Sequence, residues 1–274
     1  MTAVEGLAGL ARRGLRRTGV RRARLVAERM RLERTALALR RRGRAARAEG
    51  RILAYHAVGT PAWAFNDLAP QRFAHQLELA LDAGYRFVHP DAIARGEGAP
   101  DELAVSFDDG LASVLHHAAP VLASLRIPWT TFIVSDWAEQ GHPAVAADTF
   151  ANWRDVERMA ELGGTIGSHS VTHPNFARLS ADEAAYELGE SRRVIEARTG
   201  LAPATFAIPY GQSRDWTAEA HAAALAAGYE LVYAQAMETR FPGTVARTKI
   251  ARTDIDYVFR AALRGAYDRW EEQV

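Results

Sequence analysis

Short apolar runs alternate with segments of helical periodicity along most of the chain. Arg51–Tyr55 reads RILAY, which is typical of a buried strand, whereas Pro70–Ala83 repeats its apolar side chains at helical spacing. The same alternation predicts further strands at 103–107, 130–134, 164–167, 205–208, 230–233 and 245–251, and helices at 111–125, 153–162, 180–197, 217–227 and 257–269. Asn152 and a Ser180–Glu183 capping box mark two of the helix starts.

Strands and helices that alternate in this way predict a parallel α/β sheet with crossover helices. About seven such units favour a (β/α) barrel, in which the chemistry lies at the carboxyl ends of the strands. Polar motifs that directly follow predicted strands are therefore the first candidates for a functional site.

The first 50 residues differ from the rest of the chain in charge and in composition. They carry 15 Arg and 4 Glu, a net charge of +11, whereas the remaining 224 residues carry 19 basic and 29 acidic groups, a net charge of −10. Glycines interrupt Met1–Val20, but Arg21–Arg42 contains no Gly or Pro and is predicted to be helical, with a loose apolar stripe of Leu25, Met30, Leu32 and Leu37. We predict a basic, partly helical extension over 1–50 and a catalytic barrel over 51–274.

Two interpretations of this basic segment stay open. It could be an amphipathic helix that lies on an anionic membrane or binds an acidic partner. It could also be a solvated helical extension that packs loosely on the barrel. The weak apolar periodicity of the segment favours this second interpretation. Binding of nucleic acid is not expected.

Composition narrows the chemistry. The chain has no cysteine, which excludes disulfides, thiolate metal sites and cysteine nucleophiles, so a metal would be held by His, Asp or Glu. Arginines interrupt every candidate secretory signal, and no apolar run approaches the roughly 18 residues of a membrane span. These features predict a cytoplasmic protein whose contact with a membrane, if any, is peripheral and made through residues 1–50.

Two charged motifs follow two of the predicted strands. Asp108 and Asp109 are adjacent carboxylates at a strand end, where they need cations or a metal, and Gly110 permits the turn that would aim both at one site. His169 and His173 follow a later strand, and the proline after His173 favours a loop over a helix. Two imidazoles and one carboxylate make an open metal site. Alone, either motif could be structural, as a helix cap or as loop histidines.

A third motif follows the strand at 205–208 and reads Phe206-Ala207-Ile208-Pro209-Tyr210-Gly211. Pro209 has no backbone N–H, whereas the N–H of Tyr210 can donate a hydrogen bond. By itself this motif would be an ordinary Pro-Tyr-Gly turn.

In their order and spacing the three motifs resemble the polysaccharide deacetylase family. These carbohydrate esterases include chitin, chitooligosaccharide and peptidoglycan N-deacetylases, and the resemblance extends from Arg51 to Asp254. It implies a distorted, seven-stranded (β/α) barrel that removes N-acetyl groups from amino sugars of a polysaccharide, oligosaccharide or glycolipid.

The resemblance also implies roles for the motif residues. Asp109, His169 and His173 match the metal triad, which usually holds zinc, with cobalt or nickel as alternatives. Asp108 matches the catalytic base that takes a proton from water. The backbone N–H of Tyr210 matches the donor that stabilises the oxyanion of the tetrahedral intermediate.

The chain departs from the family pattern in the cation expected beside the catalytic Asp. That cation is usually an Arg at the start of the third motif, where this chain has Ala207. Lys249 or Arg252, on a late strand, could replace it. The late Asp-Trp motif is also missing, because Asp215-Trp216 comes too early in the chain and is interpreted as the start of a surface helix.

The usual late histidine that acts as general acid is missing as well. However, Ile52–His56 has nearly the form of that motif, and the first and last strands of a closed barrel are neighbours. We therefore predict that His56 is the general acid, with a structural histidine at the barrel mouth as the alternative.

Two other functions are compatible with these motifs. The chain could be a metal-dependent hydrolase of a non-sugar amide, for which a small closed pocket would be expected. It could also be a catalytically silent carbohydrate-binding homologue, although the intact Asp-Asp and His-His pairs argue against this.

Overall fold

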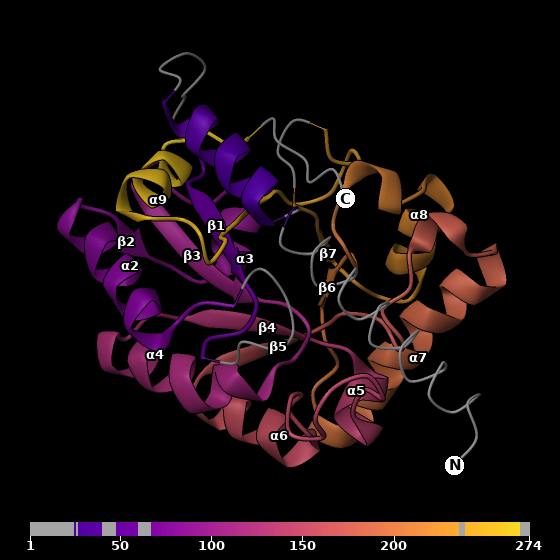
Figure 1. Ribbon diagram of the computed structural model, residues 1–274. Coiled ribbons are helices and arrows are strands. Elements are labelled where there is room, and N and C mark those ends of the chain that lie inside the picture. The colour runs from indigo at the N-terminus through magenta and orange to yellow at the C-terminus, as the bar shows by residue number, and fades with distance from the viewer. Residues whose placement is uncertain (1–24, 26, 40–47, 60–66, 236–238, 269–274) are drawn as a thin grey trace, which may run out of the picture.

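The fold is an α/β barrel built on parallel strands (Figure 1). The computed structural model describes residues 25, 27–39, 48–59, 67–235 and 239–268. In these residues the strands follow the order β7-β6-β5-β4-β3-β1-β8, and β2 pairs with β3 beside that path. The strands are β1 (Arg51–Tyr55), β2 (Arg86–Phe87), β3 (Glu102–Phe107), β4 (Trp129–Ile133), β5 (Gly164–Ser168), β6 (Thr205–Ala207), β7 (Leu231–Tyr233) and β8 (Arg247–Lys249).

The last strand closes the barrel beside the first. Ile52 and Ala54 of β1 are in parallel register with Arg247 and Lys249 of β8. On the other side, an isolated parallel bridge joins Tyr233 at the end of β7 to the chain just before β8. The seven strands along this path confirm the predicted nearly closed (β/α) barrel, to which the structure adds the short strand β2.

Helices cover the outside of the barrel (Figure 1). They are α2 (Pro70–Asp82), α3 (Pro90–Ala94), α4 (Ala119–Leu125), α5 (Ser135–Gln140), α6 (Trp153–Glu161), α7 (Ala181–Thr199), α8 (Ala218–Ala226) and α9 (Asp256–Leu263). The predicted Asn152 N-cap and Ser180–Glu183 capping box are both present, since the Asn152 and Ser180 side chains accept from the third residues of α6 and α7. The predicted helix at 111–125 starts later than expected, with a π-helical turn over Val114–Ala118, because Leu111 instead forms a bridge with Phe150.

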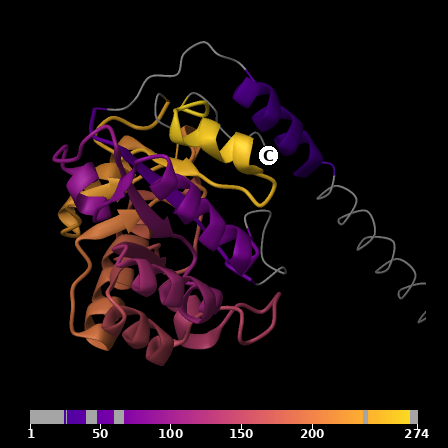
Figure 2. The same cartoon turned by 90° about the vertical axis from the view of Figure 1, so that its left-hand side faces the viewer.

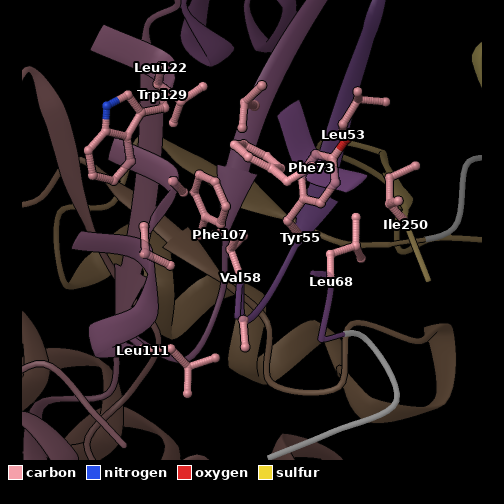
Figure 3. Close-up of a cluster of buried hydrophobic side chains, with 14 of the residues drawn as sticks. Leu53, Tyr55, Val58, Leu68, Phe73, Phe107, Leu111, Leu122, Trp129 and Ile250 are labelled. Carbon is pink, nitrogen blue, oxygen red and sulfur yellow. The ribbon is translucent and has the colours of Figure 1, made fainter. Parts of the chain in front are cut away.

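The main apolar core lies between the strands and the outer helices. Tyr55 of β1 packs edge-on against Phe73 of α2, and Phe107 of β3 lies between Tyr55 and Trp129 (Figure 3). Side chains alternate along a strand, so when Tyr55 points outward, Ile52 and Ala54 face the barrel interior. Arg247 is in register with Ile52 and therefore also faces inward.

A helix from the basic segment packs against the barrel beside α9 (Figures 1 and 2). Of its residues, 25 and 27–39 are described, and all are helical. Arg34 is 1% exposed, and its guanidinium donates to both carboxylate oxygens of Asp254 at 2.7 and 2.5 Å and to the Lys249 carbonyl at 3.0 Å. The helix is therefore held by a buried ion pair, which a loosely packed extension would lack.

The apolar stripe predicted for this helix is confirmed for Met30, which is buried, and for Leu37, which packs partly buried against the core, but it is wrong for the other two leucines. Leu25 and Leu32 are 71% and 61% exposed, and the face turned to the barrel carries Ala27, Met30, Arg34 and Ala38. Arg34 is buried on this face, and the local apolar pattern carries no signal for it because its partner Asp254 is 220 residues away. Residues 1–24 of the basic segment lie outside the described part of the chain. None of the described helices is long and apolar enough to cross a membrane.

Candidate metal-binding active site

Asp108 begins the site at the carboxyl end of β3. Its backbone N–H donates to the Tyr55 carbonyl, and its side chain is 2% exposed inside the barrel. Arg247 meets this carboxylate with both terminal nitrogens, at 2.6 and 2.9 Å. Burial alone would raise the pKa of Asp108, but the Arg247 charge and hydrogen bonds hold it below its ordinary value. Asp108 is thus an ionised carboxylate.

Arg247 supplies the cation that Ala207 does not. It lies on β8, is itself 1% exposed, and is steadied by a hydrogen bond to the Ala234 carbonyl at 3.2 Å. The prediction that Lys249 or Arg252 would pair with Asp108 is therefore wrong, because the partner is Arg247 on the same strand as Lys249. Alternation along the last predicted strand places Arg247 on the same face as Lys249, which is the signal that could have identified it. How deep each residue lies in the barrel depends on the register with β1, which the sequence does not reveal.

Asp109 points to the two histidines of the second motif. Its Oδ1 lies 3.4 Å from His169 Nε2 and 3.5 Å from His173 Nε2. One ligand atom from each of the three residues lies within 4.8 Å of the other two. The backbone makes this possible through consecutive left-handed residues, with φ of 72° at Asp109 and 63° at Gly110. The turn predicted at this position brings both carboxylates to one site.

Backbone and aromatic contacts orient the two imidazoles. His169 Nδ1 lies 2.7 Å from the carbonyl of Ala207 on β6, which leaves Nε2 facing Asp109. The ring of His173 stacks on Trp137 at 5.2 Å between centroids. Burial and the nearby His169 lower the pKa of His173 to about 4, so its imidazole is neutral, as a metal ligand must be.

The donor set therefore fits a divalent metal ion. One carboxylate and two imidazoles, each imidazole with a nitrogen turned to the carboxylate, form a three-ligand set, and in catalytic metal centres such a set leaves a fourth position for water. Burial would raise the pKa of Asp109, but the His169 hydrogen bond and the neighbouring imidazoles of His56 and His173 hold it well below its usual range. The carboxylate is thus charged and ready to bind a cation.

A carboxylate from α7 holds the loop that carries His173. Glu187 is 7% exposed and accepts from the N–H groups of Val171 and Thr172 at 2.8 and 3.0 Å and from the Thr172 hydroxyl at 2.7 Å. The loop has left-handed φ values of 72° at Ser170 and 62° at His173. These conformations cost energy, which the contacts around the loop must offset. Sequence reasoning missed Glu187, because nothing in the pattern distinguishes it from the other acidic residues of α7.

His56 and Tyr210 lie beside this cluster. His56 follows β1, is 9% exposed, and has an Nδ1 with no hydrogen-bond partner among the described residues. Burial lowers its pKa, against the opposing charges of Asp109 and Asp108. Tyr210 follows Pro209 in a turn with φ of 65°, and its ring lies 4.8 Å from that of His173. The structure brings together all six residues singled out from the sequence.

Trp216 corrects one interpretation. Expected at the start of a surface helix, it is instead 4% exposed and packs against Phe176 and Phe206. Its neighbour Asp215 accepts a 2.7 Å hydrogen bond from Asn175, which lies two residues after His173. This bond joins the loop after β5 to the loop after β6.

The fold and the site define a parallel (β/α) barrel with a candidate divalent-metal centre at its strand ends. Residues 95–232, half of the chain, match the sequence model described as polysaccharide deacetylase. The chain therefore belongs to the polysaccharide deacetylase family, as the resemblance predicted.

Individual relatives share part of the sequence and most of the barrel. A peptidoglycan-N-acetylglucosamine deacetylase from Bacillus cereus is 30% identical over 114 residues, which are 40% of this chain and 37% of that protein. The chain thus spans well under two thirds of that relative. Among solved structures, the Streptococcus pyogenes deacetylase PplD in complex with acetate has a TM-score of 0.67 at 20% identity, covering 78% of this chain and 97% of that one. IcaB from Ammonifex degensii has a TM-score of 0.64 at 23% identity, and the match covers 78% of this chain and 96% of the IcaB chain.

Proposed function

We propose that the protein is a metal-dependent N-deacetylase of amino sugars in a polysaccharide, oligosaccharide or glycolipid. The observation that carries this proposal is the position of Asp108, an ionised carboxylate held by Arg247, next to the Asp109, His169 and His173 cluster. One carboxylate is available for proton transfer and the other for a cation. The B. cereus relative named for peptidoglycan N-acetylglucosamine supports an N-acetylated glycan as the substrate.

The proposed mechanism assigns each residue a distinct task. Asp109 and the Nε2 atoms of His169 and His173 would hold the divalent ion, for which we propose zinc, with cobalt and nickel as alternatives. When bound, such an ion supplies Lewis acidity that polarises the acetyl carbonyl and makes water a better nucleophile at neutral pH. Asp108 takes the proton of the attacking water, and the Tyr210 N–H donates to the developing oxyanion.

His56 is proposed to complete the reaction. Breaking the carbon–nitrogen bond releases acetate and an amine, and the amine nitrogen must gain a proton as it leaves. His56 is buried at the end of β1, where the charges of Asp108 and Asp109 both act on it. Because burial lowers its pKa, the ring is neutral at rest, so the proton that it donates must reach it during turnover.

Acetate release tests the proposed function. A panel of N-acetylated glycans, peptidoglycan fragments and glycolipids, together with non-sugar acetamides, is incubated with the protein before and after chelation. We expect release from at least one N-acetylated sugar, loss of release with chelator, and recovery with added zinc, cobalt or nickel. Asp109→Ala is the matched control and should stay inactive with metal present. Release from only the non-sugar amides, or release insensitive to chelator, would contradict the proposal.

The role of His56 has its own test. His56→Ala should lower kcat by roughly 10²–10⁴-fold, the range typical of general acid–base catalysis, while metal content stays unchanged. His116→Ala, on the outer helical turn, is the control and should keep wild-type kcat. A much smaller loss in His56→Ala would leave His56 a structural residue of the barrel mouth.

A further inference from the structure

A row of leucines is exposed on the outer face of the helix that precedes the barrel. Leu25, Leu32 and Leu39 are 71%, 61% and 65% exposed. Their seven-residue spacing corresponds to two helical turns, so the three side chains lie along one face. The opposite face is buried against the barrel and anchored by Arg34, which fixes the direction in which the leucines point. This helix lies at the edge of the molecule, with α9 beside it (Figure 2).

In the sequence, the segments on either side of this row carry mostly positive charge. On the helix itself Arg29 pairs with Glu33 and Arg31 with Glu28, so its exposed charges balance. The basic excess of residues 1–50 comes from the sequence on both sides of the row, where seven arginines precede Leu25 and five follow Leu39 before residue 50. An apolar row that lies between two arginine-rich stretches of the sequence complements a surface that is apolar inside and anionic at its rim.

We propose that the face formed by Leu25, Leu32 and Leu39 docks the protein on an anionic phospholipid bilayer. The leucines enter the boundary between headgroups and acyl chains, and the flanking arginines interact with the anionic headgroups. A second copy of the chain fits this face less well. A coiled-coil seam needs apolar residues at two positions of each heptad, and the second position here is occupied by Glu28 and Thr35.

Co-sedimentation of the 274-residue protein with vesicles tests the proposal. Phosphatidylcholine vesicles are compared with vesicles that also contain phosphatidylglycerol, at low and high salt. We expect binding to the anionic vesicles that weakens with salt, and little binding to the neutral ones. A variant with Leu25→Ser, Leu32→Ser and Leu39→Ser should bind the anionic vesicles about tenfold or more weakly, a loss of about 1.4 kcal/mol.

The control removes exposed leucines elsewhere on the surface. Leu201 and Leu225 are 65% and 52% exposed, and Leu201→Ser with Leu225→Ser should leave vesicle binding unchanged. Equal thermal unfolding of both variants and the wild type shows that the fold is intact. The proposal is overturned if the triple variant binds like the wild type, or if it only abolishes self-association measured by light scattering. Neither result depends on deacetylase activity.

Discussion

The pairing of Asp108 with Arg247 decides the charge of the carboxylate that the proposed mechanism needs as a base. Burial disfavours the charged form of Asp108, but the bidentate ion pair with Arg247, at 2.6 and 2.9 Å, outweighs the effect of burial. A group whose pKa is lowered by folding stabilises the protein above its unfolded pKa of about 3.9, and this contribution is lost as the pH falls. Acid should therefore weaken both the fold and the activity.

Arg247→Met should reverse this balance. Without the guanidinium, burial dominates and the pKa of Asp108 rises, so the acid limb of the pH–activity profile moves to higher pH. At neutral pH we expect a loss of about 10²-fold in kcat/KM, the lower end of the effect of a general base. Profiles of kcat/KM against pH for the wild type and the variant measure both effects.

Arg252→Met is the matched control, because Arg252 is an exposed arginine shortly after the same strand. It should leave the profile in place. If both variants behaved alike, Arg247 would have no particular influence on Asp108.

At the scale of the element, α7 supports the site through one buried residue. Glu187 accepts three hydrogen bonds from the loop that presents His173. Glu187→Gln keeps the size of the side chain but replaces one acceptor oxygen with a donor and removes the charge. We expect the affinity for zinc to weaken by about 10- to 100-fold, as is typical for residues that orient metal ligands. Competition with a chromophoric chelator measures this.

Glu190→Gln provides the comparison from the same helix. Glu190 accepts two hydrogen bonds from the exposed Arg193, at 2.7 and 2.6 Å, so its replacement should leave zinc affinity unchanged. Circular dichroism of the two variants separates a loosened loop from an unfolded helix. Equal zinc affinity in the Glu187→Gln variant and the wild type would contradict the positioning role.

Most elements of the barrel were predictable because their apolar periodicity and caps are local signals. The seven strands of the closed path and the starts of α6 and α7 follow from a few neighbouring residues each. Arg247, Glu187 and Arg34 were not predictable, because their partners are distant in the chain and their burial depends on strand register and helix packing. The motif residues Asp108, Asp109, His169 and His173 were found because each motif directly follows a strand.

For the molecule as a whole, the helix before the barrel is an integral support through Arg34. This arginine and Asp254 are 1% and 0% exposed in their side chains, so removal of one leaves the other buried and unpaired. Arg34→Met should therefore lower the free energy of unfolding by about 3–5 kcal/mol. Urea denaturation followed by circular dichroism measures the change.

Arg31→Met tests the same helix at its surface, where Arg31 pairs with Glu28 and both side chains are more than half exposed. Exposed ion pairs contribute little to the free energy of unfolding, so the urea midpoint of the Arg31→Met variant should stay close to that of the wild type. A loss in Arg34→Met no larger than in this control would show that the helix is only loosely attached.

The closure of the barrel by β8 also has a kinetic consequence. Asp108 and Arg247 are 139 residues apart, and they meet only when β8 pairs with β1. Contacts between such distant segments form late, because closing a long loop costs chain entropy before the contact repays it. Until that pairing, the carboxylate has no counter-ion and the barrel has an open side. During refolding, enzymatic activity should therefore return together with the final tertiary structure, and partly folded chains should be inactive rather than slow.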